Sequence, residues 1–460
     1  MDEPADLLVT GADLVATMDA DRREIAGGWV AVTGGVVSAL GGPADPAPAA
    51  ARTLRADGCL VTPGLVNTHH HLYQNLTRAY APALRGSLFD WLTTLYPLWT
   101  RLDEEAAYVS AYVGLTELAQ GGCTTSTDHL YVFPRGGGDL ISAEIAAAVE
   151  LGVRFHPTRG SMSLSEKDGG LPPDSVVQTD EEILADSQRL VQAHHDRSPT
   201  AMVRVALAPC SPFSVTPRLM TATAELAEKL DVRLHTHLAE DKDEDEFCLA
   251  TFGRRPVDHF EEVGWGTDRS WVAHCVWPNP EEIARLGRWG TGVAHCPSSN
   301  MILSAGLAPV AELRAAGAPV GLGCDGSASA DSASLWLEAR TAMLLGKLRH
   351  GPAAMTARDA LEIATRGGAA VLGRAGEIGE LAPGACGDLV VWPLTGVPFA
   401  GALTDPVEAW LRCGPLAARH TVVAGRPVVL DGTPVHPGLD EMLTRHGTLA
   451  AKIQDALREP

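Results

Sequence analysis

The stretch TPGLVNTHHH, residues 62–71, closes a short apolar run with His69, His70 and His71. Side chains alternate between the two faces of a β-strand, so His69 and His71 are expected on one face and His70 on the other. Two neutral imidazoles held side by side form half of a divalent-metal site. Three later apolar runs carry comparable residues at their ends: His237 in LHTHLAE, His274 in WVAHC and Asp325 in GLGCDG. These four strand ends predict a metal enzyme.

Composition narrows the class of protein. The chain has 460 residues, which suits a large barrel with an appendage better than one small core. Its formal charge of −21 argues against nucleic acid or an anionic membrane as a partner, because either would need a basic face. No run approaches the roughly 18 apolar residues that span a bilayer. The acidic start, MDEPAD, does not resemble a signal peptide. The nine cysteines form no Cys-x-x-Cys pair, so a reduced cytoplasm is the expected location.

The middle of the chain alternates apolar runs with helix-like segments such as 104–120, which Gly121 and Gly122 terminate. Alternating strands and helices imply parallel strands, and eight such units predict a (β/α)₈ barrel with its chemistry at the carboxyl ends of the strands. The eight expected strands are 59–67, 124–131, 154–159, 202–208, 232–237, 270–274, 292–295 and 320–324. Short, glycine-punctuated strands at both ends favour a small β-sandwich. We therefore expect residues 1–60 and 377–460 to form the sandwich and its tail, and 61–376 to form the barrel.

The expected metal ligands are His69, His71, His237 and Asp325. A set of three histidines and one aspartate with an open position suits zinc, although ligand type alone leaves Fe²⁺ and Mn²⁺ open. The competing interpretations are a polar turn for the histidine cluster and a helix N-cap for Asp325. His235 lies deeper than His237 on the same strand face and is expected to be a core histidine with its hydrogen bonds satisfied.

Catalytic roles are expected for Glu240, His274 and Asp325. Glu240 lies three residues beyond His237, on the loop above the strand, where a carboxylate can move a proton between water and substrate. His274 is placed to polarise the attacking water or a developing oxyanion. The alternatives are an exposed glutamate at the start of the acidic run 241–246 and a core histidine.

These motifs together resemble the amidohydrolase superfamily, in its branch of aminohydrolases that includes guanine, S-adenosylhomocysteine and chlorohydrolase-like deaminases. The resemblance runs from PGLVNTHHH through HLAE, AHC and DGS to GELAPGACGDLV at 379–390. It implies the same four metal ligands and the pair Glu240 and His274. Binuclear barrel hydrolases of this kind usually carry a lysine on the fourth strand, and MVRVALAPC at 202–210 has none. One divalent ion per subunit is therefore expected.

Further stretches resemble those of 8-oxoguanine deaminases: HLYQNLTR (71–78), LFDWLTTLY (88–96), TTSTDHLY (124–131), RGSMS (159–163) and APCSPFSV (208–215). The resemblance implies hydrolytic deamination of 8-oxoguanine to urate and ammonia. Isoxanthopterin, guanine and hydroxy-s-triazine deaminases are near neighbours. Gln74, Cys210 and His295 are candidate substrate contacts. A glutamine can both donate to and accept from a purine edge, whereas a packing role is the simpler interpretation of Cys210.

Two other functions compete with deamination. A catalytically silent barrel acting as a binding partner would be expected to have lost ligands, and hydrolysis of a cyclic amide is disfavoured by the missing fourth-strand lysine and by the HLAE motif. The expected partners are a small heterocyclic substrate and water. A homo-oligomer is also expected, because barrels of this kind often pair through their outer helices.

Overall fold

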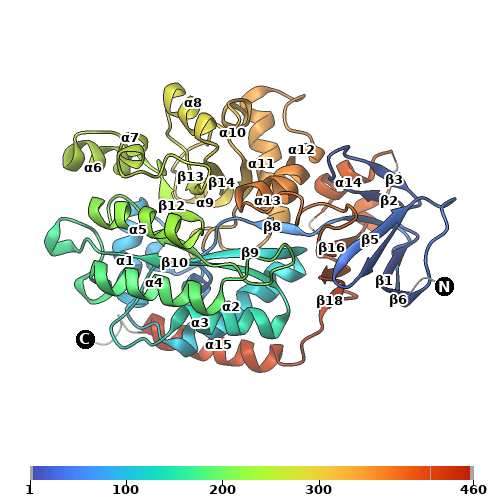
Figure 1. Ribbon diagram of the computed structural model, residues 1–460, viewed down its shortest axis with the longest axis horizontal. Helices are drawn as coiled ribbons and strands as arrows, with labels where there is room; N and C mark the ends of the chain where they lie inside the picture. The colour runs from blue at the N-terminus through green and yellow to red at the C-terminus, as the bar shows by residue number, and fades with distance from the viewer. Residues whose placement is uncertain (1–3, 403, 415, 456–460) are drawn as a thin grey trace.

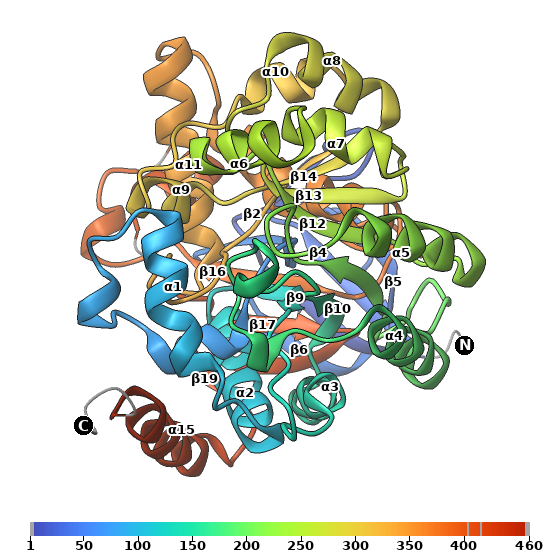
Figure 2. The ribbon, with the colours of Figure 1, turned by 90° about the vertical axis from the view of Figure 1, so that its left-hand side faces the viewer.

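A computed structural model describes residues 4–402, 404–414 and 416–455 of the protein. Eight parallel strands close into a barrel in the order β10-β11-β12-β13-β14-β15-β8-β9, and helices surround it (Figures 1 and 2). The predicted (β/α)₈ fold is therefore confirmed. The barrel strands are β8 (Leu65–Asn67), β9 (Cys123–Leu130), β10 (Arg154–Ser161), β11 (Ala206–Pro209), β12 (Leu234–Leu238), β13 (Ser270–His274), β14 (Gly292–His295) and β15 (Val320–Leu322).

The helices that follow these strands form the outer layer of the barrel. They are α1 (Leu88–Trp99), α2 (Glu104–Gln120), α3 (Leu140–Leu151), α4 (Asp180–His194), α5 (Pro217–Leu230), α6 (Lys242–Phe252), α7 (Pro256–Glu262), α8 (Pro280–Trp289), α9 (Pro297–Ile302), α10 (Val310–Ala315), α11 (Leu335–His350), α12 (Ala357–Glu362) and α13 (Gly368–Val371). A π-helical turn, Ile363–Gly367, joins α12 to α13. No helix in the described ranges is both long enough and apolar enough to cross a membrane.

The first predicted strand, 59–67, was wrong as a single element. It is two strands: β7 (Cys59–Pro63), which belongs to the small domain, and β8 in the barrel. Gly64 separates them because the chain passes so close to β9 there that a Cβ at Gly64 would lie 1.9 Å from Oγ1 of Thr124. Pro63 also has no N–H to donate to a ladder. The small domain thus leads directly into the strand that ends at the histidine cluster.

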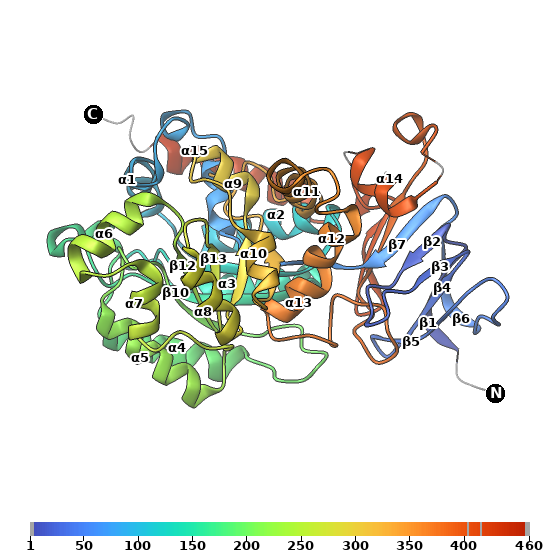
Figure 3. The same cartoon turned by 90° about the horizontal axis from the view of Figure 1, so that it is seen from above.

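Two sheets form the small domain. One has the order β5-β4-β1-β6, from β5 (Val36–Gly41), β4 (Trp29–Thr33), β1 (Ala5–Thr10) and β6 (Ala50–Arg55). The other is β19-β18-β17-β16-β7-β2-β3, from β19 (Thr433–Pro434), β18 (Arg426–Leu430), β17 (His420–Val423), β16 (Leu389–Pro393), β2 (Leu14–Ala16) and β3 (Glu24–Ala26). Buried side chains such as Leu7, Val30, Val61 and Leu389 fill the space between them. Figure 3 shows this sandwich, with α14 (Pro406–Arg412), at one end of the molecule.

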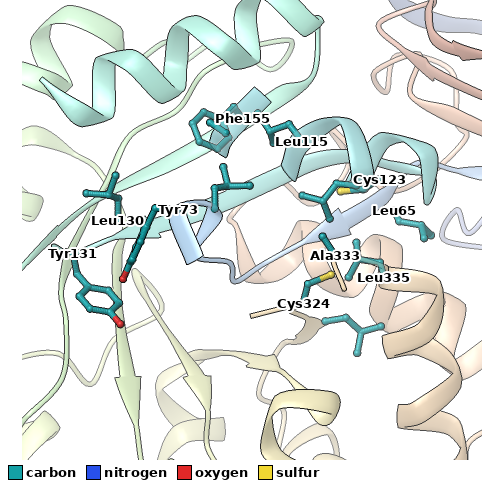
Figure 4. Close-up of a cluster of buried hydrophobic side chains, with 14 of the residues drawn as sticks. Leu65, Tyr73, Leu115, Cys123, Leu130, Tyr131, Phe155, Cys324, Ala333 and Leu335 are labelled. Carbon is teal, nitrogen blue, oxygen red and sulfur yellow. The ribbon is translucent and has the colours of Figure 1, made fainter. Parts of the chain in front are cut away.

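The barrel core and its helices share one continuous cluster of buried apolar side chains. Figure 4 shows part of it, where Leu65 of β8 and Cys123 of β9 lie near Leu115 of α2. The bounds of α2 match the predicted helix 104–120, because the Asp103 side chain accepts a hydrogen bond from the Ala106 N–H at its start. The nine cysteines are all unpaired.

Two sets of contacts tie distant parts of the chain together. Arg154 at the start of β10 donates from Nε and Nη2 to the Asp388 carboxylate over 2.9 and 3.0 Å, and both side chains are buried. This pair joins the barrel to the small domain. The helix α15 (Leu439–Gln454) lies against the barrel, where Gln454 donates to the Leu76 carbonyl over 2.7 Å. That carbonyl belongs to the 3₁₀ segment Leu72–Thr77, which follows the histidine cluster.

Candidate metal and catalytic site

The predicted site residues converge at the carboxyl end of the barrel. His69 and His71 follow β8, His237 lies in β12, and Asp325 lies three residues after β15. All four side chains are at least nine-tenths buried. Strand direction alone brings them together, because the carboxyl ends of parallel barrel strands meet at one rim.

Hydrogen bonds fix the tautomers of two of these histidines. Nδ1 of His71 lies 2.7 Å from the carbonyl of His129, and Nδ1 of His237 lies 2.7 Å from the carbonyl of Cys210. A carbonyl only accepts, so each Nδ1 carries the proton and each Nε2 keeps a lone pair. The two Nε2 atoms face each other across 3.2 Å. Burial, followed by the proximity of His71 and His274, lowers the pKa of His237 to about 3, so this ring is neutral at physiological pH. Two lone pairs at this distance repel each other unless a cation lies between them.

His69 is oriented by a third histidine. Nδ1 of His69 lies 2.8 Å from Nε2 of His235, and Nδ1 of His235 lies 3.0 Å from the Trp271 carbonyl. Nδ1 of His235 donates to this carbonyl, so Nε2 of His235 accepts from Nδ1 of His69. Nε2 of His69 is then left with a lone pair, buried and without a hydrogen-bond partner among the described residues. Burial holds the pKa of His69 well below its ordinary value, which keeps the ring neutral.

Asp325 supplies the negative charge. Its Oδ1 lies 3.4 Å from Nε2 of His69 and 3.3 Å from Nε2 of His71. The Gly326 N–H donates to Oδ1 over 2.7 Å and the Ser329 hydroxyl to Oδ2 over 3.2 Å. These two donors fix the direction of the carboxylate and favour its ionised form.

The donor set fits a divalent metal ion. Ligand atoms of His69, His71, His129 and His237 lie within 4.8 Å of one another, and so do those of His69, His274 and Asp325. Neutral imidazoles and one carboxylate, all converging and partly without hydrogen-bond partners, are the chemistry that zinc and similar ions require. His129 joins this group beyond the predicted residues: its ring stacks on that of His237, with centroids 4.9 Å apart.

Glu240 lies at the rim, two residues beyond β12. Its side chain is buried, and its own N–H and that of Ala239 donate to the Glu244 carboxylate over 2.8 and 2.9 Å. Burial, followed by the charges of Asp325 and Asp241, raises the pKa of Glu240 well above its ordinary value. A carboxyl group with a raised pKa can hold a proton near neutral pH and release it to a substrate.

His274 faces Glu240 and Asp325. Its Nε2 lies 3.5 Å from Oε1 of Glu240 and 3.9 Å from Oδ2 of Asp325, and its Nδ1 lies 2.9 Å from Oδ1 of Asn300. If the Asn300 oxygen accepts from Nδ1, then Nε2 is free to take up a proton. The backbone at His274 and Asp325 has φ values of 70° and 59°. Such left-handed conformations cost energy in residues other than glycine and cluster at functional sites.

A cavity opens beside these groups, with about 370 Å³ of space that includes its opening to solvent. Gln74 and Cys210 line it, as does Tyr96 of α1. Oε1 of Gln74 and the hydroxyl of Tyr96 are buried without a partner among the described residues. Burial raises the pKa of the Cys210 thiol to about 12, so this group is an uncharged, weak donor. Among the described groups that line it, the cavity therefore presents an unpaired acceptor, an unpaired hydroxyl and a thiol beside the candidate metal ligands.

His295 lines a separate cavity between α10 and α11, with Leu307 and Met355, and is not among the residues that line the one beside Glu240. It is still near enough to His274 for the charge of that ring to act on it. Sequence reasoning did not assign roles to His129 or Asn300. His129 and Tyr96 stand within stretches that the sequence already singles out. Asn300 lies on the helix after β14, and only its contact with His274 reveals it.

A closed parallel barrel with histidines and a carboxylate at its carboxyl rim defines the class as a barrel hydrolase. The family model described as the amidohydrolase family matches residues 60–428, and the chain belongs to this family. The chain is 50% identical to the 8-oxoguanine deaminase of Pseudomonas aeruginosa, over 95% of this chain and 97% of that protein. It is 38% identical to a hydroxydechloroatrazine ethylaminohydrolase of a Pseudomonas species, over 84% of this chain and 80% of that protein.

A solved structure shares the architecture. The crystal structure of atrazine chlorohydrolase from Arthrobacter aurescens, complexed with zinc, is 33% identical, with a TM-score of 0.92. The match covers 96% of this chain and all of that one. An isoxanthopterin deaminase is 35% identical over 89% of each chain. Family membership thus establishes a metal-binding hydrolase of C–N bonds.

Proposed function

We propose that the protein is a hydrolytic deaminase that converts 8-oxoguanine to urate and ammonia. The observation that carries this proposal is the 50% identity to an 8-oxoguanine deaminase across nearly the full length of both chains. The small cavity beside Glu240, with Trp91 and Phe213 among its lining side chains, supports a flat, free base as the substrate. The more distant relatives keep isoxanthopterin and hydroxy-s-triazines as alternative substrates of the same chemistry.

We infer that His69, His71, His237 and Asp325 hold one divalent ion, with zinc preferred over Fe²⁺ or Mn²⁺. The zinc in the chlorohydrolase structure supports that preference. When bound, such an ion supplies a water molecule acidic enough to act as a nucleophile near neutral pH. The partnerless Nε2 of His69 and the facing Nε2 atoms of His71 and His237 support this ligand set.

We assign the proton transfers of the reaction to the side chains of His274 and Glu240. His274 is expected to take a proton from the attacking water through Nε2, because the contact of its Nδ1 with Asn300 orients the ring. Glu240, protonated in the resting site, gives its proton to the ring nitrogen next to the carbon under attack. Glu240 then takes the proton of the newly added hydroxyl and passes it to the amine as the C–N bond breaks, and the proton held by His274 returns to Glu240 to restore the resting site. Water enters as the new carbonyl oxygen and the amine leaves as ammonia, so the atoms balance.

Substrate contacts are expected from the cavity wall. Oε1 of Gln74 has no partner among the described residues and can accept from a base N–H, while the Cys210 thiol can donate weakly to an oxo group. Trp91 and Phe213 also line the cavity and can cover the faces of a planar ring. His295 is not included, because it lines the other cavity. A homo-oligomer and a cytoplasmic location stay predictions.

The decisive assay measures ammonia release from 8-oxoguanine by the metal-loaded protein, with urate followed by its absorbance. Guanine, isoxanthopterin and a hydroxy-s-triazine are assayed in parallel, and the Glu240→Gln variant reports contaminating activity. We expect kcat/KM to be highest for 8-oxoguanine. A higher value for another ring would reassign the substrate and keep the mechanism. No ammonia from any of the four by metal-loaded protein would overturn the proposed function.

A further inference from the structure

A second polar cavity lies at the opposite end of the barrel from Glu240. Arg233 immediately precedes β12, Arg269 immediately precedes β13, and Arg204 lies two residues before β11. These three arginines line the cavity together with Arg197. The amino ends of parallel barrel strands share one rim, and the catalytic residues occupy the other. This cavity is therefore separate from the candidate metal site.

Around this cavity the arginines outnumber the carboxylates that form ion pairs with them. Asp231 is shared by Arg197, at 3.7 Å, and Arg269, at 3.1 Å. Glu377 is likewise shared by Arg204 and Arg374, each at 2.8 Å. Arg233 has no carboxylate within 4 Å among the described residues, although Asp268 acts on it from farther away. Four guanidinium groups thus line the cavity with Asp231 as the one carboxylate in the described part of its wall, and Glu377 pairs with Arg204 from outside it, in a protein whose formal charge is −21.

Arg233 differs from the other arginines of the cavity because it forms no ion pair among the described residues. Its Nη2 donates to the Val371 carbonyl over 2.8 Å, but its Nε is buried and without a partner among the described residues. Nε of Arg204 is in the same state. A Cβ at Gly373 would lie 2.8 Å from Nη1 of Arg233, so the backbone leaves just enough room for the guanidinium. Burial lowers the pKa of Arg233 to about 10, and the group stays charged at neutral pH.

We propose that this cavity binds a phosphate-type oxyanion. A partly buried guanidinium whose buried Nε–H has no acceptor is costly unless an anion meets it, and the planar fork of arginine matches the oxygens of phosphate. His156 lines the same cavity. Its Nε2 accepts a hydrogen bond from Nη1 of Arg374 over 3.2 Å, so the imidazole ring lies next to a fifth guanidinium group. The ligand is inorganic phosphate or the phosphate group of a small monoester.

The test is calorimetric titration of the metal-loaded, full-length protein with inorganic phosphate, at constant ionic strength maintained with chloride. We expect saturable binding by the parent protein and its loss in Arg233→Met. Arg197→Met, at the exposed mouth of the cavity, is expected to weaken binding about tenfold, which corresponds to one charge-assisted hydrogen bond. Arg218→Met is the matched control, because its side chain is 82% exposed and pairs with Asp180 in another part of the surface.

Thermal unfolding is the second readout. Phosphate should raise the Tm of the parent protein and of Arg218→Met but not that of Arg233→Met, since a ligand stabilises only the folded state that binds it. If Arg233→Met does not fold, the weakened binding of Arg197→Met carries the test. Ribose 5-phosphate, titrated in the same way, identifies a monoester site if it binds more tightly than inorganic phosphate. The proposal is overturned if the parent binds neither anion, or if all variants bind phosphate equally, which would place it elsewhere.

Discussion

Nε2 of His235 lies 2.8 Å from Nδ1 of His69, so a histidine deep in β12 sets the direction of a candidate metal ligand on another strand. The prediction of a core histidine with satisfied hydrogen bonds describes His235 only in part, because one of its bonds determines which nitrogen of His69 faces the metal site. The Trp271 carbonyl on the other side fixes the tautomer of His235. His235 is therefore a positioning residue.

We expect His235→Phe to weaken metal affinity by about 10- to 100-fold, as loss of such outer hydrogen bonds does elsewhere. His235→Gln, whose amide oxygen can accept from His69, should retain much of the affinity. Metal content after dialysis against graded chelator concentrations measures the effect. Equal metal retention by the two variants would show that the contact with His69 has no such role.

Glu240→Gln should bind metal normally and lose about 10²- to 10⁴-fold in kcat, because an amide cannot carry the proton. Metal analysis and ammonia release together check this expectation. Glu246→Gln is the matched control, since Glu246 is exposed on α6 and should keep full activity. Near-normal turnover by Glu240→Gln would remove this residue from the proton path.

Asp325→Asn should reduce both metal content and activity. The substitution removes the only carboxylate that contacts His69 and His71 through Nε2 among the described residues. Asp21→Asn, an exposed position in the small domain, controls for the loss of one charge. A fully metallated and active Asp325→Asn protein would exclude Asp325 from the ligand set.

Tyr96→Phe should raise KM by up to about tenfold with little change in metal content. The Tyr96 hydroxyl lines the catalytic cavity without a partner among the described residues, and one hydrogen bond to a ligand contributes about 1 kcal/mol. Tyr112→Phe is the control, because that hydroxyl contacts His436 outside the cavity. Identical KM values for the parent and Tyr96→Phe would show that the hydroxyl does not contact the substrate.

Stability should fall as pH rises from about 5 to 8, in part because of Glu338. Burial raises the pKa of Glu338 to about 8, whereas an unfolded glutamate titrates near 4.3. A group with a raised folded pKa stabilises fully below its unfolded pKa, and that stability is lost as pH rises through the folded value. Glu338 contributes at most about 1.4 kcal/mol per pH unit to the change in the free energy of unfolding with pH. Chemical denaturation of Glu338→Gln at several pH values should give a flatter profile. Parallel profiles would contradict this assignment.

Much of the fold follows from periodicity and strand ends. Eight apolar runs gave the barrel, and the polar residues that follow them gave Glu240 and the candidate ligands. The split between β7 and β8 could not be predicted, because it depends on the close approach of Thr124 to Gly64. The orientation of His295 toward α10 and α11 could not be predicted either. Strand alternation shows that neighbouring side chains lie on opposite faces, but it does not show which face borders the catalytic cavity.

Contacts between side chains that are distant in the sequence were the hardest to predict. The pairing of His274 with Asn300 and of His69 with His235 requires the closed barrel. The arginine cavity at the amino rim joins residues from three strand–helix units and shows no motif in the chain. Burial and missing partners, which only a folded structure gives, set these groups apart.

The contact between α15 and the 3₁₀ segment Leu72–Thr77 bears on the support of the cavity wall. His446 lies 2.8 Å from Oδ1 of Asn75, and Gln454 contacts the Leu76 carbonyl, across 371 and 378 positions of sequence. Asn75 also donates to the Ser110 carbonyl of α2, so the wall that carries Gln74 has part of its support from α2 and part from the last helix of the chain. Loss of α15 is therefore expected to loosen this wall, while His71 and His237 keep their hydrogen bonds to carbonyls within the barrel.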